Sequence, residues 1–127
     1  MLSEFVYSAM SASSLTSSEG LSAPFHRDLT LDRDFLTLPK MARLITDQHL
    51  QERDRMGRTV AFLARLVYDG WPMEGRAIAI DRETALVVDP EDGSAQVIST
   101  GCHRILSSSV SHLAVRHTAP RAACITR

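Results

Sequence analysis

The stretch from Thr46 to Arg58, TDQHLQERDRMGR, decides the fold, because an apolar run ends in it and a long helical pattern begins. Before it, an apolar pair predicts a short buried strand over Met41 to Thr46. After it, apolar residues recur every three or four positions and predict a helix over Gln51 to Tyr68. A strand followed directly by a helix predicts an α/β protein, in which ligands bind beyond the carboxyl ends of the strands.

Downstream of the predicted helix, the pattern changes to short runs of strand length. Ala77 to Ile80 and Thr84 to Asp89 are two apolar runs, and Ala95 to Ile98 is a third. The segment Pro90-Glu91-Asp92-Gly93 predicts a turn, since proline presets one φ angle and glycine permits a positive one. The sequence therefore predicts a hairpin over Thr84 to Ile98.

The remaining segments carry weaker patterns. Leu2 to Met10 has apolar residues at helical spacing and predicts a short amphipathic helix. Ser11 to Ala23 is rich in serine and predicts a loop. His26 to Leu38 favours one short strand or a turn of helix, and short strands are predicted at Arg104 to Leu106 and His112 to Val115.

Composition indicates a single globular domain. The chain has 127 residues, 44% of them hydrophobic and 23% charged, which is ordinary for such a domain. The net charge of -1 gives no electrostatic footprint for nucleic acid. Glu4 stands where a signal peptide would be basic, and the first apolar run is too short for a membrane span. We therefore expect a cytoplasmic protein with no membrane partner, in which Cys102 and Cys124 are free thiols.

The junction at His49 gathers groups that suit a binding or catalytic site. An imidazole there can act as a general base near neutral pH. Three guanidinium groups, those of Arg53, Arg55 and Arg58, suit a substrate that bears carboxylates. Two alternatives remain open from the residues alone: the histidine caps or packs, and the arginines form a solvated face.

Other site chemistries find little support. The segment Cys102-His103, with His112 and His117, supplies side chains that bind zinc, but the spacing matches no compact zinc pattern. The chain also lacks a glycine-rich phosphate loop and the HExxH and CxxC motifs. We expect neither a metal nor a cofactor.

Two motifs carry a family resemblance. The run from Asp47 to Arg58, Asp-Gln-His-Leu-x-x-Arg-x-Arg-Met-Gly-Arg, is similar to an Asp-Gln-His-Phe segment with an arginine-bearing helix. The run from Ala77 to Val87, AIAIDRETALV, is similar to a Gly-Ile-Asp-Glu-x-Thr-Ala-Leu strand pair. Together they resemble the cyanophycinase-like serine peptidases, the family that also includes the aspartyl dipeptidases. The similarity covers residues 1–98, so residues 1–101 are expected to be part of the peptidase domain and residues 102–127 a divergent tail.

The resemblance implies a three-layer α/β/α domain of the class I glutamine-amidotransferase-like, flavodoxin-like type. It also implies a nucleophilic serine on a strand-to-helix elbow, and substrates that are aspartyl-linked or arginyl-aspartate peptides such as cyanophycin. By the same resemblance His49 is the general base and Glu19 its acidic partner. The residues that line the pocket or bind acidic substrate groups would be Asp47, Gln48, Arg53, Arg55 and Arg58.

The chain departs from the family at the nucleophile. It contains no Gly-x-Ser-x-Gly elbow, which indicates a truncated copy that starts after the nucleophile. Ser8 and Ser11 are the serines within the chain that stand nearest to the role. The expected function is a serine-type peptidase acting on aspartyl peptides. An inactive binding remnant and a non-functional gene fragment remain as alternatives, and a homodimer is left open.

Overall fold

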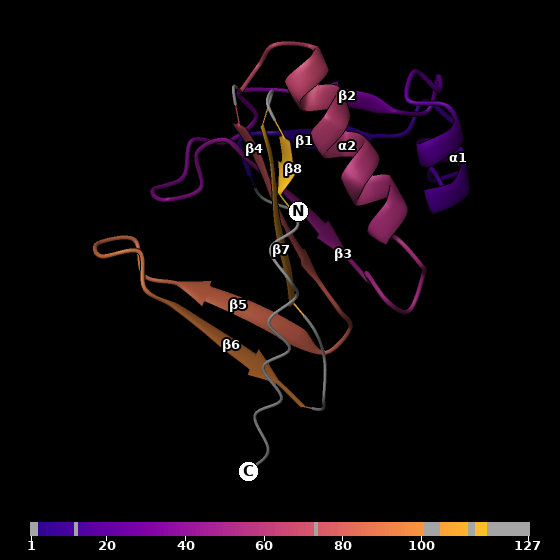
Figure 1. Ribbon diagram of the computed structural model, residues 1–127. Helices are drawn as coiled ribbons and strands as arrows, with labels where there is room; N and C mark the ends of the chain where they lie inside the picture. The colour runs from indigo at the N-terminus through magenta and orange to yellow at the C-terminus, as the bar shows by residue number, and fades with distance from the viewer. Residues whose placement is uncertain (1–2, 12, 73, 101–104, 112–113, 117–127) are drawn as a thin grey trace.

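The computed structural model describes residues 3–11, 13–72, 74–100, 105–111 and 114–116, and shows an α/β arrangement (Figure 1). In chain order the elements are β1 (Val6–Ser8), α1 (Ser17–Ser22), β2 (Thr30–Asp32), β3 (Leu44–Gln48), α2 (Met56–Tyr68), β4 (Glu74–Ile80), β5 (Thr84–Val88), β6 (Ala95–Ser99), β7 (Ile105–Ser111) and β8 (Ala114–Arg116). The largest sheet has four strands in the order β3-β4-β7-β8, and β1-β2 and β5-β6 form two-stranded sheets.

The centre of the fold is the β3-α2-β4 unit. β3 and β4 pair in parallel, from Leu44 opposite Arg76 to Gln48 opposite Ile80. Parallel neighbours need a crossover connection, which α2 provides. β7 pairs with β4 antiparallel along its whole length, and β8 pairs with β7 in the same sense. The carboxyl ends of β3 and β4 therefore lie together at one edge of the sheet.

Helix α2 packs its apolar stripe against one face of this sheet. Phe62, Leu63 and Leu66 are fully buried, and they join a core that includes Ile45 and Ala77 from the sheet. Burying a side chain of this size stabilises a fold by about 1.5–3 kcal/mol. The predicted helix is confirmed over most of its length, but it begins five residues later than expected, because the chain turns before Met56.

The predicted helix over Leu2 to Met10 is wrong for its described part, which contains strand β1, paired antiparallel with β2. The side chains of Ser3, Phe5 and Tyr7, which are spaced two residues apart, all face the interior. Phe5 packs on Trp71, and the Tyr7 ring lies 4.6 Å from the ring of Phe62. A spacing of two residues thus places the side chains in the core.

The serine-rich segment predicted as a loop contains helix α1. Thr16 and Glu19 form a capping box, in which each side chain hydrogen-bonds to the backbone N–H of the other. α1 packs closely on α2 through glycine, since a Cβ added at Gly57 would lie 2.7 Å from the Cβ of Ser17. The short helix is therefore fixed by a local cap and by a close helix contact.

The other strand predictions can be compared directly. The hairpin over Thr84 to Ile98 is confirmed as β5 and β6, which project away from the main sheet (Figure 1), and β2 is the short strand expected between His26 and Leu38. β7 and β8 overlap the short strands expected at Arg104 to Leu106 and His112 to Val115, and both belong to the main sheet. The predictions for Cys102, His103, His112, His117 and Cys124 lie outside the described residues. None of the described helices is long and apolar enough to cross a membrane.

Candidate functional site

The candidate site is the connection from β3 to α2, residues 49–55. His49 has a φ of 55° and Asp54 a φ of 45°, in the left-handed region, which costs an L residue about 1–2 kcal/mol. Backbone hydrogen bonds hold this turn: the N–H of Arg53 donates to the carbonyl of His49 at 3.2 Å, and the N–H of Arg55 to the carbonyl of Leu50 at 2.8 Å. Such outliers are common at functional sites. The same conformation also occurs outside this connection, at Asp34, Lys40, Arg43 and Glu83, so the polar side chains of the turn, and not the backbone alone, direct attention to His49.

Of the two ring nitrogens of His49, one is hydrogen-bonded and the other has no partner in the part of the chain that the structure describes. Nδ1 lies 2.9 Å from Oε2 of Glu52, and this hydrogen bond lowers the pKa of Glu52. With Glu52 ionised, Nδ1 donates, and in the neutral imidazole Nε2 then carries the lone pair. No described residue hydrogen-bonds to Nε2, and the side chain is 30% exposed. This is the arrangement that a general base requires.

The carboxylate that hydrogen-bonds to His49 is that of Glu52, whereas the resemblance implied Glu19. The carboxylate of Glu19 accepts hydrogen bonds from the backbone N–H and the hydroxyl of Thr16, at 2.9 and 2.7 Å, and the backbone bond is the larger cause of its lowered pKa. It caps α1 and is not hydrogen-bonded to His49. The sequence analysis did not single out Glu52, because its contact with His49 depends on the turn over residues 49–55, which no periodicity in the sequence reveals.

Asp47 and Arg58 bind each other in the interior of the protein. The resemblance implied that both contact a substrate, which would require accessible side chains. Each is 2% exposed. The guanidinium is bidentate, with Nε 2.8 Å from Oδ2 and Nη2 2.5 Å from Oδ1. The hydroxyl of Thr59 donates to Oδ2 as well, at 3.1 Å. The pair links β3 to α2. Asp47 and Gln48 also line a hollow of about 320 Å³, and Arg58 is not among the residues that line it.

Arg55 lies beside this pair and is itself buried, at 8% exposed. Its Nη1 donates to the carbonyl of Gln48 at 3.0 Å and lies 3.9 Å from Oδ1 of Asp47. Burial is the largest cause of the lowered pKa of Arg55; the charge of Arg58 also lowers this pKa, and Asp47 opposes both. Two guanidinium groups therefore share one buried carboxylate. The side chains of Gln48 and Arg53 are exposed at the same edge.

Asp81 is a residue of this region that the sequence analysis did not single out. It follows β4 directly and is 6% exposed, and its Oδ1 accepts the backbone N–H of Gln51 at 2.8 Å. The signal was present, since Asp81 is the aspartate of the second motif. That motif was interpreted as a strand pair, so the side chain was not considered.

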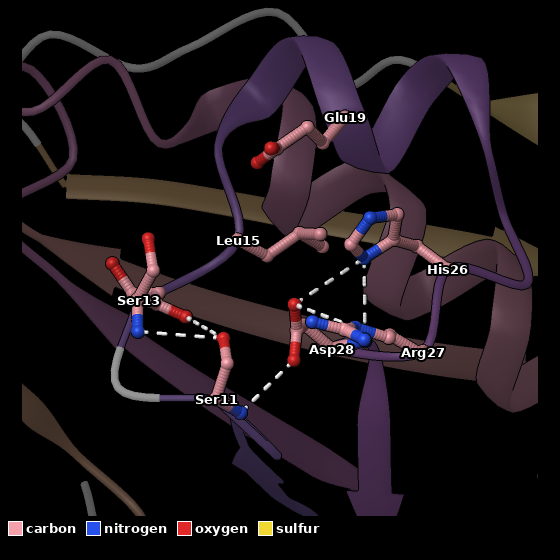
Figure 2. A pocket seen from close by; sticks show the side chains of 8 residues that line it. Ser11, Ser13, Leu15, Glu19, His26, Arg27 and Asp28 are labelled. Carbon is pink, nitrogen blue, oxygen red and sulfur yellow. Dashed lines mark hydrogen bonds and ion pairs between the residues drawn. The ribbon is translucent and has the colours of Figure 1, made fainter.

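A second polar region lies at α1, where a hollow of about 610 Å³ is lined by Ser11, Ser13, Ser14, Leu15, Glu19, His26, Arg27 and Asp28 (Figure 2). Its polar groups already bind one another. The N–H of Asp28 donates to Nδ1 of His26 at 3.2 Å, and Oδ1 of Asp28 accepts the N–H of Ser11 at 3.0 Å. Since Nδ1 of His26 accepts, Asp28 does not orient this imidazole as a catalytic acid would.

The described residues do not bring a nucleophile to His49. The hydroxyl of Ser11 donates to the carbonyl of Ser13, Ser8 is exposed on β1, and no described serine hydroxyl is hydrogen-bonded to His49. No group of three or more metal-binding side chains occurs among the described residues.

Comparisons with known proteins add no relative: no family model matches the chain, and neither a curated protein nor a solved structure is significantly similar to it. The resemblance to the cyanophycinase-like peptidases therefore rests on the two sequence motifs.

Proposed function

We propose that this chain binds aspartyl-linked peptides at the β3-α2 connection, and that His49 acts there as the general base of a serine-type hydrolysis, as the resemblance to the cyanophycinase-like peptidases implies. The observation that carries the proposal is the pair of buried guanidinium groups, Arg55 and Arg58, that share the single carboxylate of Asp47. A carboxylate of the ligand would supply the second negative charge.

The electrostatics favour an anionic ligand at Arg55. Asp47 is bidentate to Arg58 but 3.9 Å from Arg55, so Arg55 has the weaker partner. Glu52 and Asp54 are exposed, so water screens their charges more than it screens a buried pair. Their carboxylates therefore compensate the charge of Arg55 less than a buried carboxylate would. A hydrogen bond between a ligand carboxylate and Arg55 would contribute roughly 1.5–3 kcal/mol.

The proposed function goes together with a proposed fold. The parallel β3-α2-β4 unit, with the site at the carboxyl ends of its strands, supports an incomplete three-layer α/β/α domain of the flavodoxin-like type. The same proposal includes a cytoplasmic location. Its partner is a peptide of the aspartyl or arginyl-aspartate type.

A second function, binding without turnover, is favoured by a specific observation. Nε2 of His49 is free of described partners, and none of the described serine hydroxyls is bonded to it. If the reaction needs a serine in that position, the chain would keep its affinity for aspartyl peptides and lack hydrolysis.

Calorimetric titration of the full chain with β-aspartyl-arginine dipeptide tests both proposals. We expect Arg55→Gln to weaken binding by about tenfold to hundredfold. Arg27→Gln, which removes an arginine from the hollow at α1, should leave binding unchanged. Absence of binding by the wild-type chain, or a loss confined to Arg27→Gln, would refute the proposed site.

Analysis of the same mixtures for free aspartate and arginine separates the two functions. Release of amino acids that His49→Ala abolishes, with binding retained, supports hydrolysis. Binding with no release supports the second function.

A further inference from the structure

Asp81 is a buried carboxylate whose two oxygens differ in their surroundings. Oδ1 accepts the N–H of Gln51 at 2.8 Å. Oδ2 is buried and accepts no hydrogen bond from any described residue. Burying a carboxylate is unfavourable unless its oxygens are hydrogen-bonded, and a single neutral N–H compensates it only in part. Stability alone therefore gives a poor reason for an aspartate at this position.

The place of Asp81 in the fold gives a better reason for an aspartate at this position. Asp81 follows Ile80, the last residue of β4, and the end of β4 lies beside the end of β3. The N–H of Leu50 lies 3.4 Å from the carbonyl of Ile80, and the next N–H, that of Gln51, bonds to the side chain of Asp81. Two successive backbone groups directly after His49 are thus attached to the neighbouring strand.

We propose that Asp81 is a positioning residue for the site: by holding the N–H of Gln51, its carboxylate keeps His49 in the left-handed conformation and presents the free imidazole nitrogen to the ligand. The effect on a ligand rests on the proposed function. The effect on the connection does not, because it can be measured in the free protein.

Residue-resolved amide hydrogen exchange of the free chain tests the local effect. In Asp81→Ala the amide of Gln51 should exchange at least about tenfold faster, whereas Asp81→Asn, whose side-chain oxygen can still accept, should exchange at nearly the wild-type rate. Asp28→Ala is the matched control, since Asp28 is also buried and also accepts one backbone N–H, that of Ser11. It should leave Gln51 unchanged. If Asp81→Ala does not fold, Asp81→Leu retains the buried volume without the acceptor and gives the same reading.

Peptide titration tests the consequence for the site. Asp81→Ala should weaken binding of β-aspartyl-arginine about tenfold, and Asp81→Asn should restore it. Equal exchange of Gln51 in Asp81→Ala and Asp28→Ala, or an Asp81→Asn variant that behaves like Asp81→Ala, would overturn the proposal. If the wild-type chain binds no peptide, the proposed function fails, and the exchange rates alone still decide whether Asp81 positions the connection.

Discussion

At the scale of single residues, the account depends on His49. Its φ of 55° turns the chain out of β3. Its Nδ1 is hydrogen-bonded to Glu52, and its Nε2 has no hydrogen-bond partner among the described residues. A histidine in this conformation is strained, whereas glycine is not. The imidazole is thus retained at a position where the backbone would favour another residue.

The strain gives a prediction that does not depend on function. His49→Gly and His49→Ala both remove the imidazole, but only glycine relieves the left-handed conformation. We expect His49→Gly to exceed His49→Ala in free energy of unfolding by about 1 kcal/mol, measured by urea denaturation. An alanine variant of equal or greater stability would show that residue 49 does not hold this conformation in solution.

Two features of the structure could have been predicted from the sequence. They are the burial of Arg58 and the role of Glu19 as a helix cap. Arg58 precedes Phe62 and Leu66 at intervals of four residues, so it falls on the apolar stripe of the helix. A guanidinium on that stripe needs a buried acid, which Asp47 supplies. Glu19 stands three residues after Thr16, the spacing of a capping box. The identity of Glu52 as the partner of His49 depends on a turn that no periodicity reveals.

At the scale of elements, the long amphipathic helix and the hairpin were predictable because each has a strong local signal. The first strand was not, because the apolar residues within the nine-residue segment from Leu2 to Met10 satisfy helical and extended spacing almost equally well. Pairing between β1 and β2, and the packing of Tyr7 on Phe62, decide in favour of the strand. These are contacts between distant segments, which a local pattern does not contain.

The packing of α1 on α2 gives a prediction at this scale. Alanine normally stabilises a helix relative to glycine by about 1 kcal/mol. A Cβ at position 57 would lie 2.7 Å from the Cβ of Ser17 and 2.8 Å from Cδ1 of Leu21. Gly57→Ala should therefore destabilise the chain, by about 1–3 kcal/mol.

Chemical denaturation measures this effect, with Met56→Ala as the control. Met56 neighbours Gly57 and is 50% exposed, so its replacement should change stability by no more than about 0.5 kcal/mol. A stabilised Gly57→Ala variant would contradict the close approach of the two helices.

At the scale of the whole molecule, the β3-α2-β4 unit brings the two sequence motifs together. The first motif supplies the connection after β3, and the second supplies β4 and Asp81, whose side chain holds that connection. The sequence predicted the order of these elements. It did not predict which strands would be neighbours, nor that β7 would join the same sheet, because strand order depends on contacts between segments far apart in the chain.

The most direct test of the central claim is a two-dimensional ¹H–¹⁵N titration of the full chain with β-aspartyl-arginine dipeptide. The account predicts that the largest shift changes fall in residues 48–55 and at Asp81, and that they disappear in Arg55→Gln. Changes centred on Ser11, His26 and Asp28 would place the ligand in the hollow at α1 instead. That result, or a spectrum unchanged by the peptide, would contradict the assignment of the β3-α2 connection as the binding site.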